Sequence, residues 1–308
     1  MPLEEWLEQY DHEDIPLSKS AFSNRAKAHK WMTQFLRQPD QPDIALEEID
    51  KDFCRAFIKF LRCAKSDATH KKNDRPLHQS TVHGYIATIS AALNKAVRDG
   101  IIDRNPFTML SAKEKVAKRD RERDYLTIKE IKLLMRTPID HESVKNAFIF
   151  ACFTRLRISD ILKLRWSDIN IKEANDHVRY IRIQMEKTKE YVTVPLSQEA
   201  LKWLPTKGEP ELVFHELPSS RNTRNKSINT WVAASGIQKR ITFHSSRHAF
   251  ATLMLTLGGD LYTVSKLLGH KNVVTTEICA KVIDQKRIDT VNLVDRMFDD
   301  VKLEEAAV

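Results

Sequence analysis

The chain has 308 residues, of which 42% are hydrophobic, and a formal net charge of +8 at pH 7. This length favours two domains with ordinary cores, and the charge favours a polyanionic partner such as nucleic acid, although many soluble proteins are basic for other reasons. The start of the chain is acidic and no apolar run reaches membrane-spanning length, so we expect no signal peptide, no membrane partner and a cytoplasmic location. The four cysteines match no zinc-binding spacing and require no oxidising compartment: Cys54, Cys63, Cys152 and Cys279.

The first part of the chain, residues 1–110, has the pattern of a small all-α domain. Residues 18–37, 46–65 and 80–99 each place apolar side chains at helical spacing. Residues 1–16 are polar and acidic, and their pattern leaves open whether they pack or form a tail. Basic residues lie in the polar loop at 66–76 and on the helix expected at 80–99, as a DNA-facing surface or as a solvated one: Lys71, Lys72, Arg75, Lys95 and Arg98.

A segment dense in charge, residues 111–124, separates this part from a second domain, residues 125–308. After Val116 the segment is nearly free of apolar residues, which is typical of a flexible or DNA-tracking linker. The second domain begins with Thr127 and with Glu130 three residues later, the spacing of a capping box at the start of a helix.

Residues 144–154 are strongly apolar and predict a core helix. The apolar pattern continues from Leu156 to Leu164 and predicts a further helix, in which Arg157 is the odd polar member. A buried charge needs a function or a partner, and Asp160 is a candidate to hold the Arg157 guanidinium.

Residues 178–183 and 191–195 alternate in the manner of strands and predict a small antiparallel sheet, with Lys187 at the turn between them. Helices are expected after this sheet at 197–204, 225–234, 261–268 and 284–301, with a loop at 217–225 and another helix carrying His244 and Arg247.

Basic residues recur at fixed offsets in the second domain. His244 and Arg247 are three apart and share a helix face, and His270 follows Gly269, which ends an apolar run as a helix C-cap does. Together with Arg157 and Lys187, these residues suit a site for a transferring phosphoryl group, where they would stabilise charge on its oxygens without a metal.

The order Arg, Lys, His-x-x-Arg and Leu-Leu-Gly-His resembles the tyrosine recombinases, also called the phage integrase family. The resemblance covers residues 126–282 motif by motif, and the N-terminal part in general character. Single motifs are weak signals, whereas His244-Ser245-Ser246-Arg247 and Leu267-Leu268-Gly269-His270 at this spacing form a strong one.

The resemblance implies an N-terminal helical core-binding domain and an α+β catalytic domain, within a fold that is mainly α with a small antiparallel sheet. It implies that double-stranded DNA is the partner, that the chain acts as a homo-oligomer, a tetramer on paired sites, and that neither cofactor nor metal is used. The C-terminal helix would dock on a neighbouring protomer or on its own domain.

The reaction implied by the resemblance is transesterification: a nucleophile attacks a DNA phosphodiester, forms a covalent 3′-phosphoryl enzyme and releases a 5′ hydroxyl. Lys187 would be the general acid toward that hydroxyl, with Lys189 as an alternative. The carried-over catalytic residues are Arg157, Lys187, His244, Arg247 and His270; His248 matches no role and is expected to pack.

The chain departs from the family pattern at two positions. Cys279 stands where the family has its nucleophilic tyrosine, in Thr275-Thr276-Glu277-Ile278-Cys279, and Arg155 stands where glycine is usual. A cysteine sulfur lies several ångströms closer to the backbone than a tyrosine oxygen, whereas attack requires the reacting atoms about 3–3.5 Å apart. We therefore expect DNA binding with impaired cleavage. Arg155 would distort the loop that holds Arg157 or add a phosphate contact.

Other interpretations remain open at this point. A non-catalytic DNA-binding regulator on the same scaffold is favoured by Cys279, and a type IB topoisomerase-like enzyme would share the chemistry but relax supercoils as a monomer. A basic α-helical interaction protein would show weak or salt-insensitive duplex binding.

Overall fold

The computed structural model describes residues 1–11, 19–38, 44–65, 76–117, 124–171, 179–186, 189–269, 272–273 and 276. The chain divides into two compact units, the first ending at Arg121 and the second beginning at Glu122. The predicted fold class is confirmed, because the described residues are mainly helical and contain one small antiparallel sheet. None of the helices that are described combines the length and the apolar content needed to cross a bilayer.

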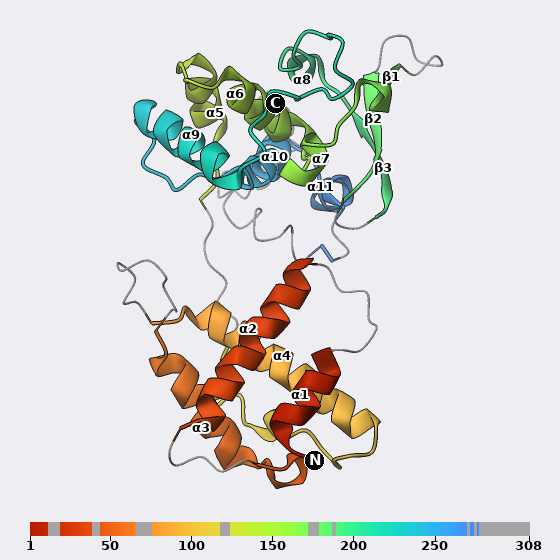
Figure 1. Ribbon diagram of the computed structural model, residues 1–308. Helices are drawn as coiled ribbons and strands as arrows, with labels where there is room; N and C mark the ends of the chain where they lie inside the picture. The colour runs from red at the N-terminus through yellow and green to blue at the C-terminus, as the bar shows by residue number, and fades with distance from the viewer. Residues whose placement is uncertain are drawn as a thin grey trace, which may run out of the picture. The chain divides into compact units, whose positions relative to one another are not determined.

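The first unit is a helical bundle around one apolar core (Figure 1). Its elements are α1 (Leu3–Asp11), α2 (Lys19–Leu36), η1 (Leu46–Glu48), α3 (Lys51–Cys63), α4 (Gln79–Arg98) and η2 (Pro106–Met109). α2 lies across α4. At the centre of the core the Phe35 ring contacts those of Phe53 and Phe57, each with its centroid 5.4 Å away.

The acidic start of the chain belongs to this core. Leu3, Trp6 and Leu7 of α1 are three and four residues apart, the spacing of one helix face, and all are buried. The Trp6 indole N–H also donates a hydrogen bond to the Ala92 carbonyl of α4, 3.1 Å away. The question that the sequence left open for residues 1–16 is thus settled for residues 3–11, which pack as a helix.

The single helix expected over residues 46–65 is divided. The turn η1 ends at Glu48, and α3 begins only after Asp50, whose carboxylate accepts a hydrogen bond from the Phe53 amide at 2.8 Å. An N-cap aspartate satisfies an amide that the first helical turn leaves unpaired, so it fixes the start of α3.

The second unit packs helices around one buried helix and places a small sheet at one edge (Figure 1). Its elements are α5 (Ile128–Arg136), α6 (Glu142–Thr154), α7 (Ile158–Ile161), η3 (Trp166–Asp168), β1 (Ile169–Ile171), β2 (Arg179–Gln184), β3 (Tyr191–Pro195), α8 (Gln198–Leu201), α9 (Arg221–Ala234), α10 (Ser245–Thr256) and α11 (Leu261–Leu268). The strand order is β1-β2-β3, antiparallel throughout, with Ile181 opposite both Ile169 and Val194.

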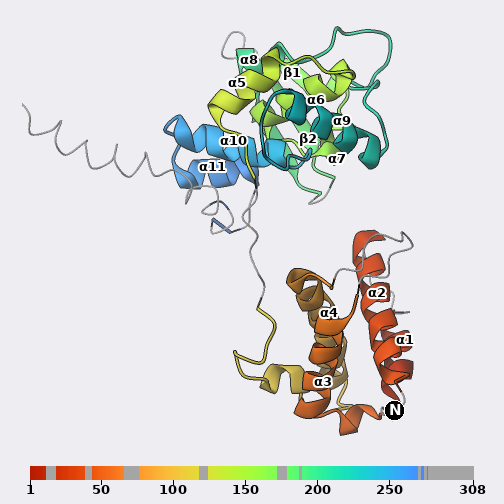
Figure 2. The same ribbon diagram turned by 90° about the vertical axis from the view of Figure 1, so that its left-hand side faces the viewer.

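α6 is the central helix of this unit, as its apolar sequence predicted. Its side chains from Ala147 to Cys152 are all buried. The Phe148 ring meets Trp231 of α9 and Phe243 just before α10, both edge to face at 5.8 Å. α10 packs along α6, and α11 lies beside α10 (Figure 2). The main core therefore joins α6 to α10, and a smaller apolar cluster joins α10 to α11.

Three of the expected boundaries in this unit are wrong. The helix predicted from Leu156 to Leu164 is the single turn α7, and the helix predicted over 197–204 is the single turn α8. The loop expected at 217–225 ends early, because the Ser220 hydroxyl accepts a hydrogen bond from the Thr223 amide and starts α9 at Arg221. The strand β1 was not predicted, since three residues are too few to show an alternation. The helix expected at 284–301 lies outside the described residues.

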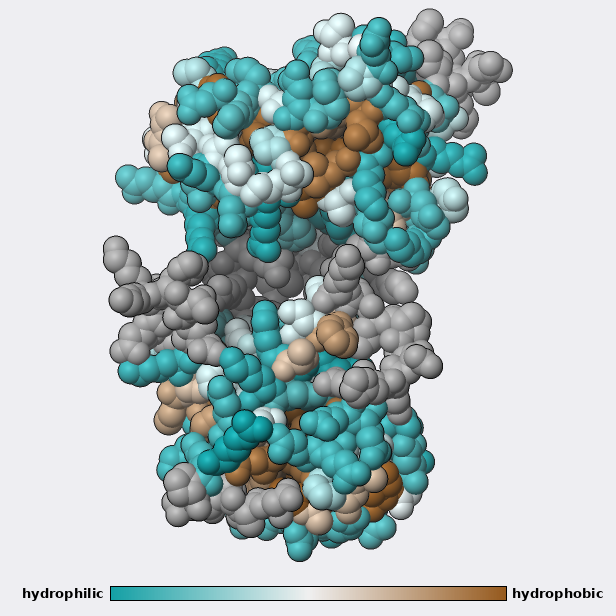
Figure 3. Space-filling model, in the orientation of Figure 1, coloured by the Kyte–Doolittle hydropathy of each residue, from teal (hydrophilic) through white to brown (hydrophobic). Residues whose placement is uncertain are grey.

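Hydrophilic residues cover most of the visible face of each unit, with smaller hydrophobic areas between them (Figure 3). Of the cysteines, Cys54 and Cys152 are buried, whereas Cys63 is exposed.

Candidate active site

Arg247 is the residue that joins the separate motifs. It lies in the first turn of α10 and is only 5% exposed. Its Nη1 donates a hydrogen bond to the Arg155 carbonyl at 3.0 Å, and its Nη2 donates another to the Leu268 carbonyl. Arg155 follows α6 and Leu268 is the last residue of α11, so one guanidinium draws the ends of two helices to the start of a third. The predicted Arg157 loop, His-x-x-Arg helix and Leu-Leu-Gly segment thus meet at one place.

The chain reverses sharply between α6 and α7. Arg155 ends α6 in the left-handed conformation, with φ 60° and ψ 2°, and its amide donates to the Ala151 carbonyl at 3.0 Å. Arg157 then has extended backbone and caps α7. The left-handed residue explains why α6 ends at Thr154 and does not run on into the segment from Leu156, because a right-handed helix cannot pass through it.

The expected ion pair between Asp160 and the Arg157 guanidinium is absent from the described interactions. The Asp160 carboxylate instead accepts hydrogen bonds from two backbone amides, that of Arg157 at 3.1 Å and that of Glu186 at 3.0 Å. Asp160 is 4% exposed, so both bonds are shielded from water. Its role is to hold the Arg157 backbone, and the half-buried Arg157 side chain extends from a turn that is fixed in this way.

The same carboxylate ties the β2–β3 hairpin to this turn through Glu186. The hairpin closes with a hydrogen bond from the Lys189 amide to the Met185 carbonyl at 2.8 Å, and Lys189 has a positive φ of 58°. Lys187 itself lies outside the described residues, between two residues whose backbone is anchored. Lys189, the alternative general acid, pairs with the Glu186 carboxylate at 3.3 Å, and Lys163 pairs with the same carboxylate at 2.8 Å. The hydrogen bond from Lys163, followed by that from Lys189, lowers the pKa of Glu186.

His244 precedes α10 and is exposed on the same helical turn as Arg247. Its ring contacts that of His248 edge to face, with centroids 5.1 Å apart. His248, which matched no role in the sequence, therefore packs against the ring of a predicted catalytic residue and restricts where that ring can lie.

His270 and Cys279 lie outside the described residues. The residue before His270, Gly269, ends α11 with φ 64°, so the C-cap expected from the sequence is present. Because L-residues other than glycine rarely adopt this conformation, Gly269 sets the direction in which the chain leaves α11.

Arg155 is a feature of this site that sequence reasoning did not resolve. Its side chain is 3% exposed although it carries a charge. Burial, followed by the neighbouring positive charge of Arg157, lowers the pKa of Arg155 to about 10, against the opposing effect of Asp160. A pKa of about 10 leaves the guanidinium protonated at neutral pH.

Asp160 was missed as a backbone anchor, although its spacing was a usable signal. An acidic residue three positions after a helix N-cap is placed to accept the N-cap amide. Arg157 and Asp160 have this spacing, and Arg165 and Asp168 repeat it with a hydrogen bond of 2.9 Å.

A cleft of about 300 Å³ lies beside the site, between α7 and the β2–β3 hairpin, and both Asp160 and Glu186 line it.

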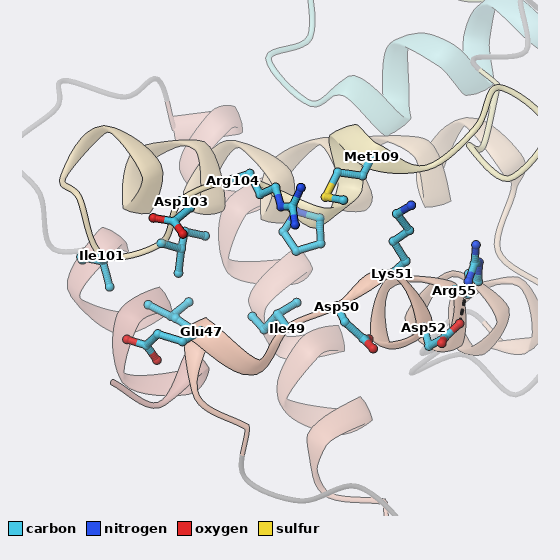
Figure 4. Close-up of a pocket in the computed structure, with 13 residues that line it drawn as sticks. Glu47, Ile49, Asp50, Lys51, Asp52, Arg55, Ile101, Asp103, Arg104 and Met109 are labelled. Carbon is cyan, nitrogen blue, oxygen red and sulfur yellow. Dashed lines mark hydrogen bonds and ion pairs between the residues drawn. The ribbon is translucent and has the colours of Figure 1, made fainter.

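Another cleft, of about 690 Å³, lies in the first unit beside η1 and the start of α3 (Figure 4). Acidic and basic groups both line this second cleft, and Arg55 is bound to Asp52 at 2.6 Å. Its lining has no excess of positive charge, so it does not suit a polyanion. The charged residues are Glu47, Asp50, Lys51, Asp52, Arg55, Asp103 and Arg104.

Comparison with known families gives two matches along the chain. Residues 124–286 match the model of the phage integrase family, and residues 3–116 match that of the phage integrase SAM-like domain. Curated relatives include a tyrosine recombinase of Pseudothermotoga lettingae, 26% identical over 266 residues that cover 84% of this chain and 87% of the relative. The tyrosine recombinase XerD of Lacticaseibacillus casei is 28% identical over 264 residues, covering 80% of this chain and 83% of the relative.

Solved structures show the same fold. A lambda integrase dimer bound to a COC′ core site aligns with a TM-score of 0.69 at 22% identity, covering 91% of this chain and 95% of that one. The Tn1549 transposon integrase in complex with transposon right end DNA aligns with a TM-score of 0.70 at 14% identity, covering 96% of this chain and all of that one.

Proposed function

Because this chain belongs to the phage integrase family, the tyrosine recombinases, we propose that it recognises specific sites in double-stranded DNA and that its scaffold is built to cleave and rejoin strands there. By family it is a DNA strand-transferring enzyme. The observation that carries the proposal is the position of Arg247, whose guanidinium joins the Arg157 turn, the His244 helix and the segment before His270.

In the proposed reaction, Arg157 and Arg247 hold the non-bridging oxygens of one phosphodiester and stabilise the charge that grows on them during attack. The nucleophile forms a bond to phosphorus, the bond from phosphorus to the 5′ oxygen breaks, and Lys187 gives a proton to that oxygen. The strand stays attached to the protein through its 3′ phosphate, and the reverse steps rejoin it. His244 and His270 complete the shell of donors around the phosphate.

The interactions around Arg157 and Lys187 support these roles. Asp160 accepts the amide of Arg157 and that of Glu186, so it anchors the backbone of the phosphate-binding turn and that of the hairpin next to Lys187. Charge stabilisation by Arg157 and protonation of the leaving oxygen by Lys187 both require that the side chain be held to within a fraction of an ångström. A shared carboxylate supplies that restraint.

Cys279 is the reason to propose that the chain as it stands cleaves poorly. Its sulfur would fall short of a phosphate placed for a tyrosine oxygen, because a cysteine side chain lacks the length of a whole ring. The proposed state is a protein that binds its sites on DNA as an oligomer, a tetramer on paired sites, in the cytoplasm, with a formed phosphate pocket and a defective nucleophile.

The test is a search for a covalent protein–DNA adduct on a denaturing gel. The chain, Cys279→Tyr and Cys279→Phe are each incubated with a pool of nicked duplexes of randomised sequence. We expect an adduct with Cys279→Tyr only, since phenylalanine supplies the same ring without the attacking oxygen. An adduct with the unaltered chain would mean that Cys279 or another group attacks and that the geometric reasoning is wrong.

A second candidate function is a non-catalytic DNA-binding regulator on the same scaffold, and Cys279 is the feature that favours it. Duplex binding by all three proteins without any adduct, even from Cys279→Tyr, would place this function first. Supercoil relaxation by a monomeric Cys279→Tyr protein on DNA with a single site would instead favour a type IB topoisomerase-like activity.

A further inference from the structure

The Arg155 side chain has no evident structural purpose in the turn that it occupies. Its backbone has φ 60°, a conformation in which glycine is unstrained and an L-residue such as arginine is not. Glycine would form the turn equally well, because the structural bonds use only the Arg155 backbone: its amide donates to Ala151 and its carbonyl accepts from Arg247. The side chain is therefore an addition to the turn and needs its own explanation.

The guanidinium of Arg155 is buried and incompletely paired. The residue is 3% exposed, and its Nε and Nη1 are buried atoms without a hydrogen-bond partner within the part of the chain that the structure describes. Buried polar groups in proteins are almost always hydrogen-bonded, and a buried cation without an acceptor is especially unfavourable. Two donors thus lie ready for an acceptor that the described residues do not provide.

The surroundings of these donors favour an anion. The positive charge of Arg157 acts on Arg155, and the carbonyl of Arg155 itself receives the Arg247 guanidinium. Among the described residues, Asp160 is the acidic group whose charge acts on Arg155, and its two carboxylate oxygens already accept the amides of Arg157 and Glu186. Arg155 thus lies near a second positive charge, that of Arg157, and the nearby Asp160 carboxylate is already engaged.

The side chain also reaches the segment that leads to His270. Nη1 of Arg155 lies 3.7 Å from the position that a Cβ on Gly269 would take. The unpaired donors are therefore placed between the Arg157 turn and the end of α11, where the predicted phosphate-binding residues meet.

We propose that Arg155 binds a phosphate oxygen, as an additional arginine of the phosphate site beside Arg157 and Arg247. The identification of that phosphate with the DNA backbone rests on the proposed function. The contact offsets the strain of an arginine at φ 60° and gives the site a positive charge that a glycine at this position would lack.

The test uses inorganic phosphate as the probe and the full chain at constant ionic strength, with isothermal titration calorimetry as the measurement. Arg155→Gly should bind phosphate about tenfold more weakly than the unaltered chain, the loss of one charge-assisted hydrogen bond. Arg136→Gln, which removes an exposed positive charge from the end of α5, should stay within about twofold. Equal affinity of Arg155→Gly and the unaltered chain, or no phosphate binding by either, would overturn the proposal.

Arg155→Asn is the second variant, because asparagine tolerates the left-handed conformation and removes the charge. If Arg155→Gly failed to fold, the same tenfold loss in Arg155→Asn would support the proposal and an unchanged affinity would refute it. Thermal melting in phosphate-free buffer shows whether a variant is folded. Both Arg155→Gly and Arg155→Asn should melt at or above the temperature of the unaltered chain.

Duplex DNA then separates this inference from the proposed function. With a random duplex of about 20 base pairs, Arg155→Gly should reduce the slope of log Kd against log salt by about one, the loss of one phosphate contact. If no duplex is bound but phosphate affinity still falls in Arg155→Gly, the Arg155 site stands without the recombinase function. If Cys279→Tyr forms its adduct and Arg155→Gly binds phosphate as before, the function stands and the role of Arg155 is wrong.

Discussion

At the scale of single residues, Arg247 holds the ends of α6 and α11 to the start of α10. The Arg247 guanidinium donates hydrogen bonds to two backbone carbonyls, one after α6 and one at the end of α11. An ammonium group in its place would lose one of these two hydrogen bonds, because it lacks the planar fork of donors. Arg247→Lys should therefore lower the free energy of unfolding of the second unit by about 2 kcal/mol, the range for buried hydrogen bonds of charged groups. Urea denaturation followed by circular dichroism measures this change.

The matched control for Arg247→Lys is Arg136→Lys, on an exposed side chain at the end of α5, which should change the unfolding free energy by less than about 0.5 kcal/mol. Equal stability of the two variants would mean that the carbonyl contacts of Arg247 carry no net energy.

The sequence predicts residues of this site to different degrees. Arg157 stands out because a cation inside an apolar helical pattern requires a reason, and Arg247 stands out because it shares a helix face with His244. The structure brings the two motifs together. The conformation of Arg155 could not be predicted, because a non-glycine residue at positive φ gives no compositional signal. The partner of Asp160 was assigned to the wrong group, since spacing on a helix does not reveal that the helix is a single turn whose N-cap amide is the nearer donor.

At the scale of elements, the start of α5 contains an acidic group whose charge stabilises the fold. The Glu130 carboxylate accepts hydrogen bonds from the Thr127 amide and from Lys239, each 2.8 Å away. Burial alone would raise the pKa of Glu130, but the hydrogen bond from Lys239, followed by those from Thr127, outweighs it and lowers the pKa below its ordinary 4.5.

A lowered folded-state pKa gives the sign of the pH dependence. The contribution of Glu130 is complete above its unfolded-state pKa and is lost as the pH falls from about 4.5 through the folded value. Glu130→Gln should therefore lower the unfolding free energy at pH 7 and show a weaker decrease in stability between neutral and acidic pH. Urea titrations at several pH values measure both effects.

Glu199→Gln is the control for this pH dependence, because Glu199 forms an exposed pair with Lys202 on α8. Its stability curve should follow that of the unaltered chain. A Glu130→Gln curve parallel to the unaltered one would exclude the carboxylate as a source of the acid sensitivity.

The predicted element boundaries agree with the structure where the sequence contains strong capping residues, and they are wrong where it does not. α11 matches its predicted range because Asp260 caps it and Gly269 ends it, and both residues have strong local preferences. The segment from Leu156 to Leu164 has the apolar spacing of a helix but forms one turn. The left-handed Arg155 precedes it, and at its end the Leu164 carbonyl accepts a hydrogen bond from the distant Val213 amide at 2.9 Å, a contact that local periodicity does not contain. β1 is held by pairing with β2, which is a long-range effect that a local pattern does not contain.

For the whole molecule, the distribution of the apolar cores predicts independent folding. The buried core of the first unit contains residues from Leu3 to Val116, and the main core of the second contains residues from Leu126 to Ala249. A fragment of residues 1–117 should therefore unfold cooperatively by itself, as a helical domain of about this size can. Circular dichroism with thermal melting checks this, and it also tests the predicted domain limits at 110 and 125.

The control for the fragment is one that ends at residue 98, which lacks Phe107, Leu110 and Val116 of the same core. It should lose the sharp transition. A gradual, non-cooperative melt of the 1–117 fragment would mean that the first unit depends on the rest of the chain.

The two amides that share the Asp160 carboxylate have a consequence for how the second unit responds to a ligand. A rigid link of this kind transmits displacement: if a ligand pulls the Arg157 turn, the hairpin must follow or give up a buried hydrogen bond. Binding at the arginines and placement of the β2–β3 hairpin are then thermodynamically reciprocal events, each favouring the other. Recognition of a phosphate and readiness of the proton donor would thus arise together, through one aspartate that touches neither.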